Sequence, residues 1–311
     1  MKHFAIFMSF RMHALPKEGS ASGLSFLSVQ RLEEISPRIA EFAAYLPIVL
    51  IGSVEQDIEL LEKREALIAS GKHKGNTRES KEYKTFLPQE CTTIQFEWAV
   101  GMILSDASLQ YNTNCKSCRL KMQQVDYHYA FMAISCYLLA PWIYEGISAG
   151  KQRQKSVMHE MQTITHVAFM PLADLFQNPC VQKRKNAVIS KVISPNIEKY
   201  LTPLCVAAWF MGDGGRQCYK ENGGKGLEFH TQGFTEADVH MLVSALSNRY
   251  GWKTKATFDG KNRKGQETFL ISVSGESFDS FVHHIGPFIP DSFKYKLPDA
   301  RKPKSRFKKE Y

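Results

Sequence analysis

Two aspartates stand at the ends of two apolar segments of the chain. Residues 98–108 read WAVGMILSDAS and residues 207–216 read AAWFMGDGGR, so Asp106 and Asp213 each follow a run of apolar and small side chains. Desolvation penalises a carboxylate beside such a run unless its charge is compensated. The same unusual placement, found twice, makes the two aspartates the first candidates for chemistry.

The two segments align without gaps and match small residues with small residues. Gly101 meets Ala208 and Ser105 meets Gly212 when the two aspartates are superimposed. Small side chains let two helix backbones approach closely. If the two helices pack in parallel, their C-terminal ends coincide and both carboxylates lie close together.

Two carboxylates at neighbouring helix C-termini repel each other, and the helix dipoles add negative potential. A divalent cation resolves this conflict, and carboxylate and carbonyl oxygens suit Mg²⁺. A metal ion between paired acids is suited to in-line phosphodiester displacement. The predicted metal-binding residues are therefore Asp106, Asp213, Ser105 and Gly212. The alternative is that each aspartate only caps a turn.

The elements around the two aspartates repeat. The aspartates lie 107 positions apart (213 minus 106), and each unit is predicted to run helix, hairpin, helix, hairpin, helix. The periodicity and turn residues predict α+β units. The helices are expected at 94–105, 125–144, 169–177, 202–212, 235–251 and 275–286, and strands at 118–124, 156–165, 227–232, 253–258 and 268–273, the last two flanking a turn that begins at Asp259-Gly260.

Composition bounds the remaining possibilities. The 311 residues carry 40 Lys and Arg against 31 Asp and Glu, a net charge of +9, which permits a polyanionic partner. Seven scattered cysteines, with one Cys115-x-x-Cys118 pair, indicate a reducing compartment rather than a zinc site. No apolar run approaches the ~18 residues that a membrane span needs. We expect a partly helical extension with a basic linker at 1–90, two subdomains at 91–190 and 191–298, and a basic tail at 299–311.

These residues carry a family resemblance. WAVGMILSDAS and LCVAAWFMGDGG resemble the two signatures of LAGLIDADG homing endonucleases of the two-motif, monomeric branch. HTQGFTEADVHMLVSALSNRYG and FIPDSFKYKLP also resemble the second half of intron-encoded organellar members, those of yeast included. The resemblance covers about 92–298; Ala107 departs from it, because glycine is common at that position, and residues 1–90 match nothing.

The resemblance implies a fold, an activity and site residues. The fold would be α+β, with two pseudo-symmetric αββαββα units, the motif helices at their interface and two antiparallel sheets forming a DNA-binding saddle. The activity would be Mg²⁺-dependent double-strand cleavage of a long DNA target, with Mn²⁺ as a substitute, serving intron mobility. Asp106 and Asp213 take the metal-ligand role by position. Lys296 in KYKLP matches the basic catalytic residue of one half, and Lys191 is its counterpart in the other.

Alternation along the predicted strands selects residues that face the DNA. Arg, Lys, Gln, His, Thr and Ser side chains of this kind suit base edges and phosphates, although a solvated sheet face would look similar. The predicted DNA-binding residues are Arg119, Lys121, Gln123, Arg216, Lys220, Glu228, His230, Gln232, Lys253, Lys255, Thr257, Lys261, Arg263, Lys264, Thr268 and Ser272.

Two other functions remain open beside the endonuclease. The same fold can serve as an RNA-binding maturase that assists splicing of its own intron, or as a catalytically inactive DNA-binding relic. The presence of both aspartates and both lysines favours the nuclease over the relic. An intein is disfavoured, because no Cys or Ser begins the chain and no His-Asn pair ends it. We expect no membrane and no obligate protein partner, and a soluble protein of a mitochondrion or chloroplast.

Overall fold

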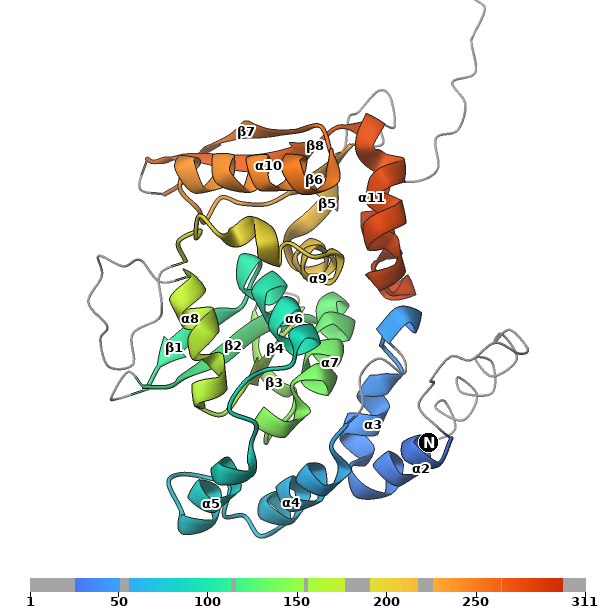
Figure 1. Cartoon of the computed structure of the whole chain (residues 1–311), viewed down its shortest axis with the longest axis vertical. Helices are drawn as coiled ribbons and strands as arrows, with labels where there is room; N and C mark the ends of the chain where they lie inside the picture. Colours follow the sequence, from blue (N-terminus) through green and yellow to red (C-terminus); the bar gives the residue numbers. More distant parts are fainter. Residues whose placement is uncertain are drawn as a thin grey trace, which may run out of the picture.

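The computed structural model of the chain describes residues 26–50, 56–112, 116–153, 156–176, 191–217, 226–263 and 265–298. Two αββαββα units follow one another along the long axis of the molecule (Figure 1). The first unit contains α6 (Thr93–Leu104), β1 (Ser108–Tyr111), β2 (Cys118–Val125), α7 (Tyr129–Leu138), β3 (Ser148–Arg153), β4 (Ser156–Gln162) and α8 (Met170–Phe176). The second contains α9 (Pro203–Asp213), β5 (Gly214–Arg216), β6 (Leu227–Phe229), α10 (Glu236–Tyr250), β7 (Thr254–Lys261), β8 (Glu267–Val273) and α11 (Phe278–Ile285).

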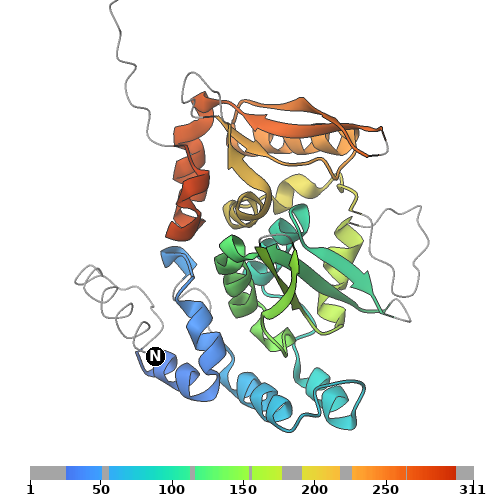
Figure 2. The same cartoon turned by 180° about the vertical axis from the view of Figure 1, so that it is seen from behind.

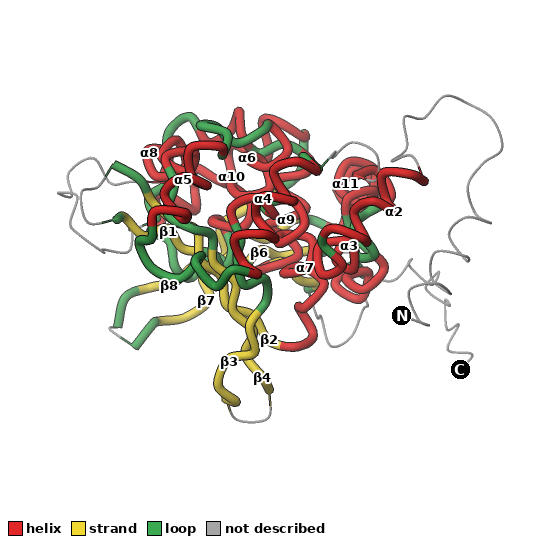
Figure 3. Tube along the Cα trace, turned by 90° about the horizontal axis from the view of Figure 1, so that it is seen from below, coloured by secondary structure: helices red, strands yellow, loops and turns green. Residues whose placement is uncertain are grey.

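Each unit builds one four-stranded antiparallel sheet. We call them sheet A, ordered β1-β2-β4-β3, and sheet B, ordered β5-β6-β8-β7. The helices lie on one side of both sheets, and in the view from behind the strands face the viewer (Figure 2). The same separation of helices from strands is visible along the long axis (Figure 3). This is the predicted α+β fold of two similar units.

The register of the first hairpin repeats in the second. Ser108 pairs with Lys121 in sheet A, and Gly215 pairs with Glu228 in sheet B. Both partners are displaced by 107 positions (215 minus 108, and 228 minus 121), the spacing of the two aspartates. The internal repeat of the sequence is therefore a structural repeat as well.

Helix ends follow local sequence signals. Thr92 caps α6 in a capping box with Gln95, and Thr235 does the same for α10 with Asp238. Gly251 ends α10 in the left-handed conformation, with φ of 67°. None of the helices in the described ranges combines the length and apolar character that crossing a bilayer requires.

Two sequence expectations about elements are wrong. The helix expected at 125–144 is only Tyr129–Leu138, because β2 continues to Val125 and a 3-10 turn containing Pro141 follows the helix. The turn expected at Asp259-Gly260 is a bulge inside β7 instead, where Gly260 has φ of 112°. The hairpin turns later, between β7 and β8 at 262–266.

The described part of the N-terminal extension packs against the first unit. It contains α2 (Phe26–Ile35), α3 (Pro37–Ala43), α4 (Ile58–Ala69) and α5 (Arg78–Phe86). The segment 71–84, expected as a basic linker, ends in α5, because Thr77 caps that helix and the buried Tyr83 fixes it.

Main-chain carbonyl groups between α7 and β3 anchor the extension. The Tyr83 hydroxyl donates to the Pro141 carbonyl at 2.7 Å. Arg64 donates to the carbonyls of Ile143 and Tyr144, and its side chain is buried. Buried carbonyl groups need such partners, so this part of the extension completes the first unit.

Candidate active site and nucleic-acid interface

The motif helices α6 and α9 are buried along most of their length. From Trp98 to Leu104 and from Leu204 to Gly212, every residue is buried. A helix that is apolar all round must be surrounded by protein. Both helices therefore lie in the interior, with their C-terminal ends directed to the same place.

The two helices touch where the sequence alignment pairs Gly101 with Ala208 and Ser105 with Gly212. A Cβ atom placed on Gly101 would lie 2.6 Å from the Ala208 Cβ and 2.2 Å from the Cys205 carbonyl oxygen. A Cβ atom on Gly212 would lie 2.4 Å from the Ser105 side chain. Each glycine thus meets the residue equivalent to itself in the other unit. Contact between equivalent positions is the signature of a two-fold related interface.

This helix–helix contact brings Asp106 and Asp213 close enough for their charges to interact. Asp213 is the last residue of α9, whereas Asp106 lies two positions beyond the end of α6 and is exposed. Burial and the nearby Asp106 carboxylate raise the pKa of Asp213 to about 7, against the opposing effect of Lys191 and Lys296. A nearby cation would compensate this desolvation and repulsion and so favour the ionised form of Asp213.

One lysine contacts the C-terminal end of each motif helix. Lys296 donates to the carbonyl oxygens of Met211 and Gly212 at 2.7 and 2.9 Å, and its side chain is buried. Lys191 donates to the carbonyl oxygen of Ser105. The last carbonyls of a helix have no partner within it, and a cation beside them is stabilised.

Burial dominates the electrostatics of both ammonium groups. It lowers the pKa of Lys296 to about 8, although Asp213 and Asp106 act in the opposite direction. Burial also lowers the pKa of Lys191, opposed by the same two carboxylates. Two acids and two lysines therefore meet where the motif helices end.

A glutamine that sequence reasoning missed also reaches the site. The side-chain amide of Gln124, on β2, donates to the Asp106 carboxylate. Its carbonyl oxygen lies 2.9 Å from Nδ1 of His128, whose pKa falls to about 4 because of burial and nearby Lys296. The signal was present: Gln124 has the inward parity of Leu120 and Met122, so it is a polar residue at a core position.

Ala107 and Gly214 occupy equivalent positions with different constraints. A Cβ atom on Gly214 would lie 2.0 Å from the ring of Phe210, so that position requires glycine. The residue equivalent to Phe210 in the first unit is the smaller Ile103. Alanine is accommodated at position 107, where it is buried. The smaller side chain of Ile103 therefore explains why alanine can replace the usual glycine at position 107.

The donor set at the helix ends fits a hard divalent cation. It combines the two carboxylates with the carbonyl oxygens of Ser105 and Gly212, and oxygen donors suit Mg²⁺. Each of these carbonyls accepts one lysine hydrogen bond, and a carbonyl oxygen has two lone pairs. Across the described ranges there is no cluster of three or more His, Cys, Asp or Glu residues that could hold a metal. A cation here would need carbonyl and water ligands beside the two acids.

The outward row of β2 carries Arg119, Lys121 and Gln123, as expected from alternation. Nε and Nη2 of Arg119 both donate to Oε1 of Gln110, at 3.0 and 2.6 Å. Lys121 and Gln123 both contact Glu160 of β4, at 2.8 and 2.5 Å. The row is thus a hydrogen-bonded polar surface on sheet A.

Sheet B presents a mixed set of the predicted residues. The Gln232 amide donates to Asp259 at 2.7 Å, and His230 lies 3.6 Å from Glu228. The exposed predicted residues of this sheet, its adjoining loop and its hairpin are Arg216, His230, Lys255, Lys261 and Arg263. Lys220 and Lys264 lie outside the described residues.

Three predicted contacts on sheet B are placed differently from expectation. Ser272 lies on the predicted outward face, opposite Glu228 and Lys255, and Thr268 has the same parity, but both side chains are buried on the central strand β8 rather than exposed. Their hydroxyls are already bonded, to the Gly260 carbonyl and to Thr257. Lys253 lies outside β7 and pairs with Glu276. These three are the weaker candidates for DNA contact.

Comparisons with known proteins agree with this arrangement. A sequence profile described as the LAGLIDADG DNA endonuclease family matches residues 96–281. Probable intron-encoded endonuclease 1 of Wickerhamomyces canadensis is 27% identical over 231 residues, which cover 71% of this chain and 91% of that protein. Cytochrome b mRNA maturase bI2 of Saccharomyces cerevisiae is 39% identical over 107 residues, 34% of this chain, but the match spans only 23% of the maturase.

One solved structure shows the same fold. The homing endonuclease I-WcaI bound to its DNA recognition sequence superposes with a TM-score of 0.62 at 23% identity. The match covers 76% of this chain and 97% of that protein.

Proposed function

The chain belongs to the LAGLIDADG DNA endonuclease family, and from this premise we propose that it is a site-specific double-strand DNA endonuclease of the homing type. The observation that carries this proposal is the meeting of Asp106, Asp213, Lys191 and Lys296 at the ends of two packed helices. The site lies between two sheets that turn their strands to the same side of the molecule (Figure 2). A DNA duplex lying across both sheets would present its backbone to the four charged groups.

Each charged group has a role in phosphodiester hydrolysis. Nucleases of this family generally use a divalent metal, and we propose Mg²⁺, with Mn²⁺ as a substitute, held by Asp106 and Asp213 with carbonyl help from Ser105 and Gly212. Such an ion, when bound, would supply water activation and stabilisation of the leaving oxygen. Lys191 and Lys296 place positive charge where the transition state gains negative charge. Gln124 fixes the Asp106 carboxylate through its hydrogen bond.

The two-unit organisation supports a monomeric enzyme. Both acids reside on one chain and meet across an internal interface, so one chain supplies both strand cuts. We propose subdomains at 91–190 and 191–298, an extension at 1–90, and a mitochondrial or chloroplast location, as in the resemblance. DNA cleavage would serve the mobility of the intron that encodes the protein.

Cleavage-site selection tests this function. The full chain is incubated with a randomised duplex library and Mg²⁺, and the new DNA ends are sequenced. The proposal predicts a single long target with short 3′ overhangs at the cut. Absence of cleavage with both Mg²⁺ and Mn²⁺ would refute it.

A second candidate function is maturase activity on intron RNA. It is favoured by one observation, the 39% identity to part of the yeast cytochrome b mRNA maturase bI2. An RNA-binding surface need not involve the aspartates. Splicing of the host intron in vitro, with and without the protein, separates this activity from DNA cleavage.

A further inference from the structure

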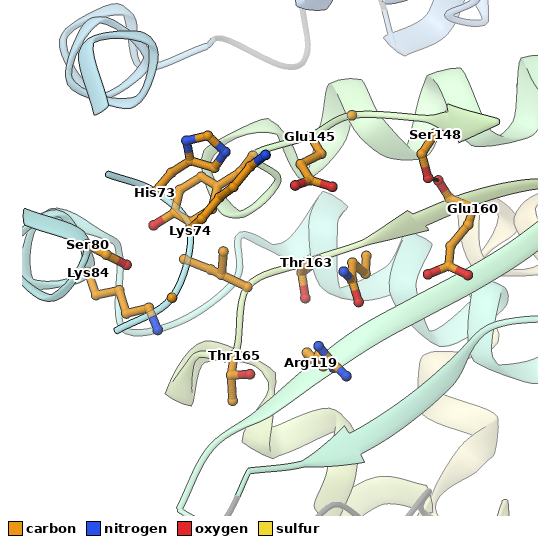
Figure 4. A pocket seen from close by; sticks show the side chains of 15 residues that line it. His73, Lys74, Ser80, Lys84, Arg119, Glu145, Ser148, Glu160, Thr163 and Thr165 are labelled. Atoms are coloured by element: carbon orange, nitrogen blue, oxygen red, sulfur yellow. Dashed lines mark hydrogen bonds between the residues drawn. The ribbon is translucent and has the colours of Figure 1, made fainter. Parts of the chain in front are cut away.

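The N-terminal extension forms one wall of a cavity at the end of sheet A. Sheet B, sheet A and α5 follow one another along the long axis of the molecule (Figure 1). A cavity of about 410 Å³ lies between the segment 73–84 and the strands β2 and β4 (Figure 4). This wall precedes residue 96, where the family match begins. The cavity is thus an addition to the two-sheet platform.

Cationic side chains face the cavity from both sides. Lys74 and Lys84 line it from the extension, and Arg119 lines it from β2 (Figure 4). Within the described ranges, neither lysine has a carboxylate within ion-pairing distance. Lys84 is half-buried, and burial lowers the pKa of its ammonium group. A desolvated ammonium group without a counter-ion gains from a bound anion.

The two carboxylates on the lining are unequal competitors for these cations. Glu160 is already held by Lys121 at 2.8 Å and by the Gln123 amide at 2.5 Å. Glu145 lies on the wall that leads to β3 (Figure 4). Glu160 is therefore neutralised from outside the cavity, which leaves Glu145 as the only carboxylate of the described lining to balance Lys74, Lys84 and Arg119.

The cavity continues the surface that we assign to DNA. Arg119 belongs to the outward row of β2, with Lys121 and Gln123. Its guanidinium uses two N–H groups on Gln110, and three of its five donors remain for a ligand. A duplex that lies across sheets B and A would pass this cavity as it leaves sheet A. Phosphate oxygens are the natural acceptors for Lys and Arg at such a position.

The extension holds Lys84 in place. α5 is capped by the Thr77 side chain, which accepts from the Ser80 amide at 3.0 Å. The neighbour of Lys84, Tyr83, is bonded to the Pro141 carbonyl at 2.7 Å. A cation on an anchored helix loses less conformational entropy on binding than one on a free loop.

We propose that this cavity binds a backbone phosphate of the target DNA just beyond the half-site covered by sheet A. The N-terminal extension is then part of the DNA-binding surface and lengthens the bound site on one side only. This inference rests on the proposed nuclease function.

The test compares salt dependence between matched variants. Lys74→Gln/Lys84→Gln removes the two extension cations, and Lys81→Gln is the control, because Lys81 is exposed on the same helix but does not line the cavity. Binding of the full chain is measured by fluorescence anisotropy at several salt concentrations. The probes are two duplexes centred on the selected cut site. One ends with the half-site on the sheet A side, and one continues for a further helical turn of about 10 bp.

On the long duplex, the slope of log K against log salt should become shallower by roughly 0.9 for each phosphate that the double variant no longer neutralises. Lys81→Gln should leave the slope unchanged, and on the short duplex all proteins should agree. The proposal is overturned if the double variant matches Lys81→Gln on the long duplex. It is also overturned if binding to both duplexes weakens equally.

The two levels of the proposal fail separately. If the wild-type chain selects no cut site, the nuclease function fails. If it cuts DNA but the double variant keeps the wild-type slope, only the phosphate site fails. Thermal melting of each variant verifies that the fold is retained.

Discussion

Substitution of Gly101 by alanine should separate the two motif helices and damage both stability and cleavage. The added Cβ atom would lie 2.2 Å from the Cys205 carbonyl oxygen, whereas ordinary contact begins at 3.4 Å. The helices must therefore move apart by about 1.2 Å at this point, the difference between these two distances. Rotation of a side chain cannot relieve the contact, because the oxygen belongs to the main chain.

Two opposing effects set the magnitude. Alanine in a helix interior is favoured over glycine by about 0.8–1 kcal/mol. Overpacking in a core costs about 1–3 kcal/mol, and the rigid partner places this site at the upper end. The net loss is then about 2 kcal/mol, or a fall in Tm of roughly 4–8 °C. Since a displacement of about 1 Å can cost 10²-fold in rate, cleavage should fall by about that factor.

Gly233→Ala is the matched control, because nothing lies within 4 Å of a Cβ atom at that exposed turn position. Both variants are compared with the wild type by calorimetry and by single-turnover cleavage of the selected target. Gly101→Ala should melt earlier and cut more slowly, and Gly233→Ala should behave like the wild type. If the two variants melt together and cut equally, the close contact of the helices at Gly101 is refuted.

Three further predictions concern the charged groups. Without metal, Asp213→Asn should melt at a higher temperature than the wild type at pH 8, and this difference should vanish below pH 4. The folded-state pKa of Asp213, about 7, exceeds its ordinary value of 3.8, so the wild type loses stability as the pH rises between these values. Equal melting temperatures at pH 8 would contradict the raised pKa. Gln124→Leu should weaken divalent-ion binding roughly 10–100-fold with DNA binding retained, measured by calorimetric titration of Mn²⁺; unchanged affinity would mean that Gln124 does not position Asp106. Lys296→Met should slow single-turnover cleavage by roughly 10²–10³-fold; a wild-type rate would remove Lys296 from the mechanism.

Much of the site could be predicted because its determinants are local in sequence. The apolar runs ending at Asp106 and Asp213 define the two central helices, and their small residues define the contact between them. The alternation in β2 also predicted its outward row. These patterns record burial, which is what sequence periodicity reports.

The remainder depends on tertiary context that no local pattern contains. Asp259-Gly260 has turn composition, but pairing with β8 continues past it and converts the glycine into a bulge. Polar residues at 71–84 resemble a linker, yet Tyr83 finds a buried carbonyl in the first unit. Gln124 has the parity of a core position, and its partner, Asp106, is 18 residues away in sequence.

The most direct test of the proposed active site is cleavage by Asp213→Asn beside the wild type. Both proteins are incubated with the selected target duplex and Mg²⁺, and nicks are counted on each strand while binding is measured in parallel. We predict that Asp213→Asn binds the duplex with affinity close to that of the wild type and cuts neither strand. Wild-type-like nicking by Asp213→Asn would contradict the assignment of Asp213 to the metal.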